Sequence, residues 1–359
     1  MHLLINTGGG DAPGLNAVIR AATLGALNRG WRITGIRYGY EGLLSGTPDG
    51  LVELDRDRVR GIAHLGGTIL GSINKGNPFA FPVERDGQWV EQDISDRVVE
   101  RFHELGADAL IAVGGDGSLG IARRFQEKGI PIVGVPKTID NDIRLTNFTF
   151  GFDTAVSIAT EAIGRLHTTA ESHRRVMVVE VMGRYAGWIA LHAGIAGGAD
   201  AILVPEVEFD IEKVTEKIRA REAAGRHFTI VVVAEGAKPV GGEMSTIGTE
   251  VGREVRLGGI GERVAAEIGQ RTGKETRSVV LGHIQRGGSP TAFDRLIALR
   301  FGAAAVRLVE RGAFGQMVAY QPPEMVGVPI EDAISQLKNV PLDCDTMHTA
   351  REMGICFGN

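Results

Sequence analysis

Short apolar runs alternate with helical patterns along nearly the whole chain, and this alternation restricts the possible folds more than any other feature of the sequence. The apolar runs predict buried strands over residues 2–6, 32–38, 109–113, 130–135, 176–181, 201–204, 230–234 and 279–281. The clearest helical patterns cover residues 15–30, 95–105, 154–170, 294–311 and 331–338. Strands that alternate with helices favour parallel sheets covered on both faces, so we predict an α/β fold.

The length of 359 residues and a break in the pattern near Gly151 indicate two domains. We expect two similar doubly wound domains with mainly parallel central sheets. Residues 77–95 predict an exposed loop or hairpin insertion, and the tail after Gln321 is rich in proline. Ligands of open α/β sheets bind at the carboxyl ends of the strands, so we expect the active site there, in the cleft between the domains.

Charge, cysteine content and hydropathy exclude several classes of protein. The chain has 39 basic and 44 acidic residues and a net charge of −5, so no global basic field points to nucleic acid or a membrane surface. The two cysteines, Cys344 and Cys356, form no CxxC motif and predict no disulfide framework. No apolar run of about 18 residues predicts a membrane span, and the first residues do not resemble a secretion signal. We therefore expect a cytoplasmic protein.

The segment Pro136–Asp142, Pro-Lys-Thr-Ile-Asp-Asn-Asp, follows a predicted buried strand. It places a lysine, a threonine and two carboxylates at the end of that strand, where chemistry usually occurs in an open α/β sheet. Acids at positions i and i+2 of an extended segment project to the same side, so Asp140 and Asp142 are expected to face one site. One could act as a general base while the other holds a metal. A turn rich in Asp and Asn uses the same residue types, so a structural role also stays open.

Three glycine-rich turns predict places where backbone approaches a ligand closely. Residues 7–14 join a strand to a helix, which offers N–H groups and a helix N-terminus to an anion. Residues 66–72 form a second such turn, and residues 114–118, Gly-Gly-Asp-Gly-Ser, form a third. Asp116 is suited to a phosphate bound to Mg²⁺, although a tight strand–helix turn uses the same residues. A nicotinamide site fits less well, because the strand over 32–38 does not end in an acid that would hold a ribose.

Charged residues also follow the later strands. Arg184 follows the strand over 176–181, and Glu235 follows the strand over 230–234. A single histidine or arginine is usually structural, but His283 and Arg286 share a strand end bounded by glycines. This spacing favours a pair that binds phosphate.

Five motifs together resemble the 6-phosphofructokinase family. They are Gly-Gly-Asp-Ala-Pro-Gly-Leu-Asn at 9–16, Gly-Gly-Asp-Gly-Ser at 114–118, Thr-Ile-Asp-Asn-Asp at 138–142, Val-Glu-Val-Met-Gly-Arg at 179–184 and Gly-His-Ile-Gln-Arg-Gly-Gly-Ser-Pro at 282–290. The resemblance runs in the family's order from residue 2 to about 320. It implies a glycolytic enzyme that uses Mg²⁺ to transfer a phosphoryl group to the 1-hydroxyl of fructose 6-phosphate. It also implies a phosphoryl-donor domain of residues 1–150 plus about 289–335, and a fructose 6-phosphate domain of residues 151–288 plus about 336–359.

The resemblance assigns roles to individual residues. It implies a catalytic set of Asp140 as the base with Thr138, Asp142 and Arg184, and Mg²⁺ ligands Asp116 and Asp142. The implied sugar-side contacts are Thr138, Asp140, Met182, Gly183, Arg184 and Glu235, and the implied 6-phosphate contacts are Arg175, Arg277, His283 and Arg286. The implied donor contacts are Gly10, Ser72, Asn74, Lys75, Gly115, Asp116, Gly117 and Ser118. Asn74 stands where short bacterial members carry an arginine, and Lys75 could replace it.

Two residues bear on the phosphoryl donor. Gly117 is the small residue expected of family members that use ATP, because an aspartate there would crowd and repel a nucleotide α-phosphate. Lys137 is the residue that pyrophosphate users carry. We give Gly117 more weight, because a steric and like-charge block is harder to evade than an additional cation is to tolerate. ATP is therefore the expected donor, with pyrophosphate as the alternative.

In this family Arg175 and Arg277 reach into a neighbouring subunit's site, so the resemblance implies a homo-oligomer with shared active sites. A tetramer is favoured, and a dimer stays open as the alternative. A non-catalytic protein that binds nucleotides or sugar phosphates on the same scaffold is a third possibility. It would be expected to lack Asp140, which this chain retains.

Overall fold

The computed structural model describes residues 1–45, 47–73, 76–85, 87–248 and 256–359. The contacts divide the chain into two compact units. Unit 1 comprises Met1–Ile139, Ile143–Gly151 and Arg286–Gln336, and unit 2 comprises Asp140–Asp142, Phe152–Gln285 and Leu337–Asn359. The α/β class and the mainly parallel sheets predicted from the sequence are confirmed.

Unit 1 is built on a seven-stranded sheet with the order β15-β14-β7-β6-β1-β2-β3. The five central strands are parallel, while β3 and β15 pair antiparallel at the two edges. The strands of this sheet are β1 (His2–Thr7), β2 (Arg32–Ile36), β3 (Leu51–Glu53), β6 (Ala109–Gly114), β7 (Ile132–Pro136), β14 (Gln316–Gln321) and β15 (Glu324–Pro329). The helices of this unit are α1 (Leu15–Leu27), α2 (Glu41–Leu44), η1 (Pro48–Gly50), α3 (Ser95–Glu104), α4 (Asp116–Glu127), α9 (Ala292–Glu310) and α10 (Ile330–Ile334).

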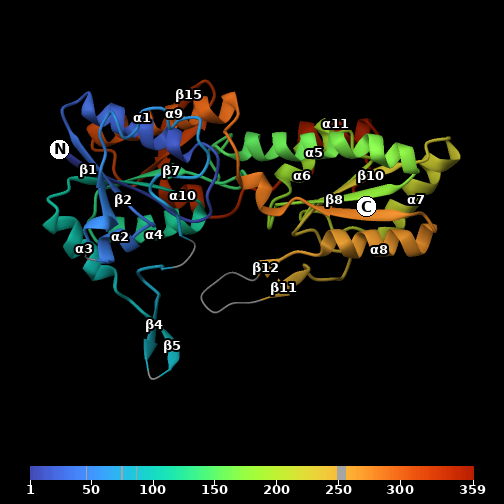
Figure 1. The fold of residues 1–359 in the computed structure, drawn as a ribbon, viewed down its shortest axis with the longest axis horizontal. Coiled ribbons are helices and arrows are strands. Elements are labelled where there is room, and N and C mark those ends of the chain that lie inside the picture. The colour runs from blue at the N-terminus through green and yellow to red at the C-terminus, as the bar shows by residue number, and fades with distance from the viewer. Residues whose placement is uncertain (46, 74–75, 86, 249–255) are drawn as a thin grey trace. The chain divides into compact units, whose positions relative to one another are not determined.

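Both faces of this sheet are covered because successive residues of a strand point to opposite sides. Leu3 and Ile5 of β1 pack into one core with α1 and α9, whereas Leu4 packs into a second core with α3, α4 and α10. In Figure 1, α1 and α9 lie above the strands of unit 1, and α2, α3 and α4 lie below them. Strands buried on both faces must be apolar throughout, which explains the near-continuous apolar runs in the sequence.

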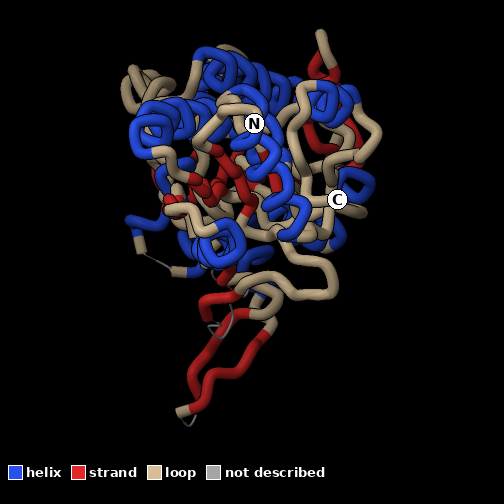
Figure 2. Tube along the Cα trace, turned by 90° about the vertical axis from the view of Figure 1, so that its right-hand side faces the viewer, coloured by secondary structure: helices blue, strands red, loops and turns tan. Residues whose placement is uncertain are grey.

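The insertion predicted over 77–95 contains a hairpin of β4 (Phe81–Arg85) and β5 (Gln88–Gln92). Its two strands pair with each other and with no other strand in the described part of the chain. Figure 1 shows β4 and β5 extending away from α2, α3 and α4 of the same unit, and Figure 2 shows the pair of strands in a second view. Trp89 on β5 is 62% exposed, so the hairpin contributes little to the core.

Unit 2 is built on a four-stranded parallel sheet with the order β13-β8-β10-β9. Its strands are β8 (Val176–Val181), β9 (Ala201–Leu203), β10 (Thr229–Ala234) and β13 (Thr276–Val280), and a separate pair is formed by β11 (Thr246–Gly248) and β12 (Arg256–Leu257). Its helices are α5 (Phe152–His173), α6 (Trp188–Ala196), α7 (Ile211–Ala223), α8 (Ile260–Thr272) and α11 (Asp345–Glu352). The short 3-10 helix η2 (Gly282–Arg286) spans the division between the units.

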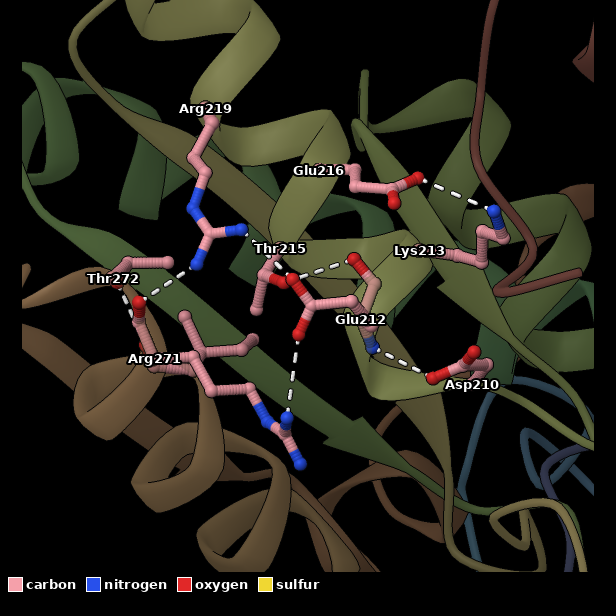
Figure 3. Close-up of polar contacts among 9 residues, drawn as sticks. Asp210, Glu212, Lys213, Thr215, Glu216, Arg219, Arg271 and Thr272 are labelled. Carbon is pink, nitrogen blue, oxygen red and sulfur yellow. Dashed lines mark hydrogen bonds and ion pairs between the residues drawn. The ribbon is translucent and has the colours of Figure 1, made fainter.

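The sheet of unit 2 also has helices on both faces. Val176 and Val178 of β8 share a core with apolar residues of α7 and α8, and α5 and α6 pack against the same sheet. In Figure 1, α5 lies above these strands and α8 below them. Glu212 of α7 pairs with Arg271 of α8 at 3.3 Å and so links the two helices, and it also pairs within α7 with Arg219 at 2.8 Å (Figure 3).

Several predictions about local structure are wrong. Asn141 has φ of 52°, a left-handed conformation, so Asp140 and Asp142 do not lie on an extended segment. The sequence predicted no strand in the proline-rich tail after Gln321, where the structure has the edge strand β15, and proline is tolerated at sheet edges. The predicted strand 279–281 begins earlier, at Thr276, and the predicted strand 32–38 ends at Ile36.

Within the described residues, no helix combines the length and the apolar character needed to cross a membrane.

Candidate active site

The three predicted glycine turns meet at the carboxyl ends of β1 and β6 in unit 1. The N–H of Gly8 donates to the carbonyl of Val113 at 2.9 Å, and the N–H of Gly9 donates to Ile73 at 3.1 Å. The Ser72 hydroxyl donates to the carbonyl of Gly9. The structure therefore brings Gly10, Ser72 and the turn over 114–118 together.

Neighbouring side chains lie close to several of these glycines. A Cβ atom on Gly8 would lie 2.8 Å from the Ser118 hydroxyl oxygen, and one on Gly114 would lie 2.2 Å from the Ser118 Cβ. A Cβ on Gly10 would lie 2.9 Å from the Arg286 guanidinium. Ser118 thus packs against the turn rather than being an isolated polar residue.

Helix α4 begins within the predicted phosphate turn. Gly115 is its N-cap, and Asp116, Gly117 and Ser118 form its first turn. The backbone N–H groups of a first helical turn have no partner inside the helix and favour an anion. A Cβ atom on Gly117 would have no neighbour within 4 Å, so this position is open.

Lys137 is buried, and its ammonium donates to the carbonyl of Gly10. Its backbone N–H donates to Gly114 at 2.9 Å. Lys137 therefore ties two of the glycine turns together. Arg286 contacts the same region, because its guanidinium donates to the carbonyl of Asp11 at 3.1 Å.

The division between the units falls inside the motif that carries the predicted base. Thr138 is buried in unit 1, where its carbonyl accepts a hydrogen bond from Thr149 at 2.7 Å. Asp140, Asn141 and Asp142 belong to unit 2. Asp140 and Asp142 are partly buried, and Asn141 between them is buried.

The predicted sugar-side residues of unit 2 lie in two turns that pack together at the carboxyl ends of β8 and β10. The N–H of Glu235 donates to Val181 at 2.9 Å, and that of Gly236 donates to Gly183 at 3.1 Å. A Cβ on Gly236 would lie 1.8 Å from the carbonyl oxygen of Arg184, so only glycine fits there. Met182, Gly183, Arg184 and Glu235 are thereby held close together.

Arg175 and Arg277 are also brought together, by a residue that sequence reasoning missed. Glu275 pairs with Arg175 at 2.8 Å and with Arg277 at 2.7 Å. The hydrogen bond from Arg175 is the main cause of the lowered pKa of Glu275. The lowered pKa keeps the Glu275 carboxylate charged. Glu275 is an ordinary charged residue at the start of a strand, so the sequence gives no signal for this role.

His283 is exposed on η2, and Gln285 beside it is buried. The Gln285 side chain accepts from the N–H of Met182 at 3.4 Å and donates to Gly282 at 3.0 Å. Gln285 is a second residue that the sequence did not single out. Asn74 and Lys75 lie outside the described residues.

The acids predicted to hold Mg²⁺ are chemically suitable but do not form a complete protein cage. Asp116 is exposed at the start of α4, and Asp142 is partly buried. No group of three or more His, Cys, Asp or Glu residues that could hold a metal occurs in the described ranges. Mg²⁺ keeps several waters and binds through one or two carboxylates together with substrate phosphates, so carboxylates such as Asp116 and Asp142 are suitable ligands for it.

Comparison with known proteins settles the family. The family model described as "Phosphofructokinase" matches residues 2–309. The chain belongs to the phosphofructokinase family. The chain is 50% identical to an ATP-dependent 6-phosphofructokinase 2 of Clostridium perfringens, over 99% of this chain and 98% of that protein.

Relatives that are about equally similar to this chain are named for different phosphoryl donors. The chain is 51% identical to a pyrophosphate–fructose 6-phosphate 1-phosphotransferase of Streptomyces coelicolor, over the full length of both. Among solved structures, the phosphofructokinase of Pichia pastoris in the T-state matches with a TM-score of 0.80 and 32% identity. That match covers 98% of this chain and 36% of the Pichia chain.

Proposed function

We propose that this phosphofructokinase-family member transfers the γ-phosphoryl group of ATP to the 1-hydroxyl of fructose 6-phosphate, forming fructose 1,6-bisphosphate and ADP in glycolysis. The observation that carries the proposal is the convergence of three glycine turns on the first turn of α4, with an open position at Gly117. Backbone N–H groups and a helix N-terminus suit the phosphates of a nucleotide. In this proposal Gly10, Ser72, Gly115, Gly117 and Ser118 contact the donor.

In the proposed chemistry a side chain accepts the proton of the attacking hydroxyl group. The 1-hydroxyl oxygen attacks the γ-phosphorus, its bond to phosphorus forms as the bond to ADP breaks, and Asp140 accepts the hydroxyl proton. Asp116 and Asp142 would hold Mg²⁺, which when bound neutralises charge on the phosphate oxygens. Thr138 and Arg184 complete the proposed catalytic set.

The far end of the sugar phosphate is proposed to be held by Arg175, Arg277, His283 and Arg286. Arginine binds a phosphate dianion through two parallel hydrogen bonds, which fixes orientation as well as charge. The turns that carry Met182, Gly183, Arg184 and Glu235 would hold the sugar hydroxyls. We also propose a cytoplasmic homo-oligomer, tetrameric or dimeric, in which Arg175 and Arg277 serve the site of a neighbouring subunit.

Pyrophosphate is the second candidate donor, favoured by Lys137. However, the ammonium of Lys137 already holds the carbonyl of Gly10, so this lysine has a role that does not depend on pyrophosphate. The open position at Gly117 supports ATP, because it leaves space beside the donor site.

The test measures fructose 1,6-bisphosphate formation with ATP or pyrophosphate as donor, in the unmodified chain and in Gly117→Asp. The position is open and its φ is not left-handed, so the variant should fold normally. The added carboxylate should lower kcat/KM for ATP by roughly ten-fold or more, because like charges placed together cost several kcal/mol.

Gly164→Asp is the matched control, because Gly164 is an exposed and equally open glycine of α5. It should leave ATP use unchanged. Turnover of the unmodified chain with pyrophosphate but not ATP would contradict the ATP proposal. A Gly117→Asp variant that uses ATP normally would contradict the placement of Gly117 at the donor site.

A further inference from the structure

A short piece of the C-terminal segment lies against the turn that carries the proposed base. The backbone N–H of Lys338 donates to the carbonyl of Asp142 at 2.7 Å. The Lys338 ammonium donates to the side-chain oxygen of Asn141 at 3.0 Å. Both contacts lie within unit 2.

The same piece of chain is fixed from its other side by the start of α6. The indole N–H of Trp188 donates to the carbonyl of Lys338 at 2.7 Å, and the ammonium lies 5.7 Å from the centre of that ring. Two residues on, the N–H of Val340 donates to Glu206 at 2.8 Å. Glu206 also accepts from the N–H of Gly187, the N-cap of α6, at 3.0 Å. Lys338 is therefore held in place by a helix rather than by the turn alone.

Asn141 is the residue through which this contact can act on the two acids. Its φ of 52° lies in the left-handed region, which most residues avoid and asparagine tolerates. This conformation sets the directions in which Asp140 and Asp142 leave the backbone. A bond from a fixed ammonium to the Asn141 side chain restricts the turn to one arrangement.

We propose that Lys338 is a positioning residue, which holds Asn141 in its left-handed conformation and so aims Asp140 and Asp142 for phosphoryl transfer. This inference rests on the proposed function. Burial lowers the pKa of Lys338 to about 8, and the charge of Asp142 acts against that shift. The role assigned to Lys338 concerns geometry, since misplacing a catalytic group by about 1 Å can cost roughly 10²-fold in rate.

The experiment is a double-mutant cycle on kcat, built from Lys338→Met and Asn141→Gly. Methionine keeps most of the apolar stem and removes the donor, while glycine removes the acceptor and adopts φ of 52° without strain. Each single variant should lower kcat by roughly 10-fold or more, with the KM for fructose 6-phosphate changed much less. The double variant should be about as slow as the slower single variant, because both changes break the same contact.

The matched control is Lys217→Met. Lys217 is another lysine of unit 2 that donates to the C-terminal segment, and its ammonium lies 2.6 Å from the carbonyl oxygen of Gly354. This variant should leave kcat unchanged. If Lys338→Met fails to fold, Lys338→Gln takes its place in the cycle, because it removes the ammonium and keeps a polar side chain.

Unchanged kcat in a folded Lys338 variant would overturn this inference and leave the proposed function in place. Independent effects that multiply in the double variant would also overturn it, because Lys338 would then act by its charge rather than through Asn141. An unmodified chain with no turnover would overturn the proposed function, and this inference with it.

Discussion

Asp140 lies in a turn whose shape depends on the left-handed residue that follows it, Asn141. The sequence predicts a candidate base here, because an acid-rich segment follows a buried strand. It could not predict the shape of the turn, because asparagine adopts both extended and left-handed conformations. It also gave no sign of Lys338, whose contact with Asn141 spans 197 positions of the chain.

Replacing Asp140 by asparagine tests the proposed base. Asn cannot accept the hydroxyl proton, so kcat should fall by roughly 10²-fold to 10⁴-fold, with the KM for fructose 6-phosphate little changed. Steady-state kinetics with varied fructose 6-phosphate measure both constants. Asp343→Asn, an exposed acid of the same unit, is the control and should behave as the unmodified chain. Normal turnover in Asp140→Asn would assign the base to another group.

At the level of elements, β8 and α8 of unit 2 are joined by a buried carboxylate. Helix α8 has no side-chain cap of its own, since its N-cap is Gly259. Glu180 of β8 supplies the acceptor instead, taking a hydrogen bond from the N–H of Gly261 at 2.8 Å. Burial raises the pKa of Glu180, and the bonds from Gly261 and Gly259 oppose this shift.

Two substitutions of Glu180 separate its hydrogen bond from its charge. Gln keeps an acceptor for Gly261 and Leu does not, so Glu180→Leu should be less stable than Glu180→Gln by about 1–3 kcal/mol. A carboxyl group whose pKa is raised by folding binds its proton more tightly in the folded state. The stability that Glu180 contributes is therefore lost as the pH rises above the ordinary carboxyl value of 4.5, and Glu180→Gln removes this one loss.

The melting temperatures of these variants, measured between pH 4.5 and 8, check both statements. As the pH rises, the melting temperature of Glu180→Gln should increase relative to that of the unmodified chain. A constant difference would show that Glu180 has no raised pKa, and equal stability of Gln and Leu would show that the cap contributes nothing.

The sequence predicted central elements better than edge elements. Strands such as β8 and β10 are buried on both faces, so an apolar run marks each of them. The edge strand β15 is exposed or half-buried at most positions and is bounded by prolines, so neither hydropathy nor periodicity marks it. Glu275 and Gln285 were missed for a related reason, because their partners are fixed by the register of neighbouring strands and turns rather than by local sequence.

At the level of the whole molecule, the proposal of shared sites predicts complementation between subunits. Asp140→Asn and Arg277→Ala should each be nearly inactive alone. In a hybrid dimer, one site would receive both changes and the other would receive neither, so about half of the normal turnover should return. Co-expression with two different tags, purification on both and an assay of the hybrid measure this recovery. If the hybrid turns over no faster than the more active of the two single variants, Arg277 does not serve the site of a neighbouring subunit.

The central claim is the transfer of a phosphoryl group from ATP to the 1-hydroxyl of fructose 6-phosphate. Phosphorus NMR of the unmodified chain with ATP, Mg²⁺ and fructose 6-phosphate follows donor, acceptor and product in one sample. The account predicts that the γ-phosphate signal of ATP is replaced by a second sugar-phosphate signal of equal intensity, at carbon 1, as ADP appears. Unchanged ATP signals, or ADP accompanied only by free phosphate, would contradict it.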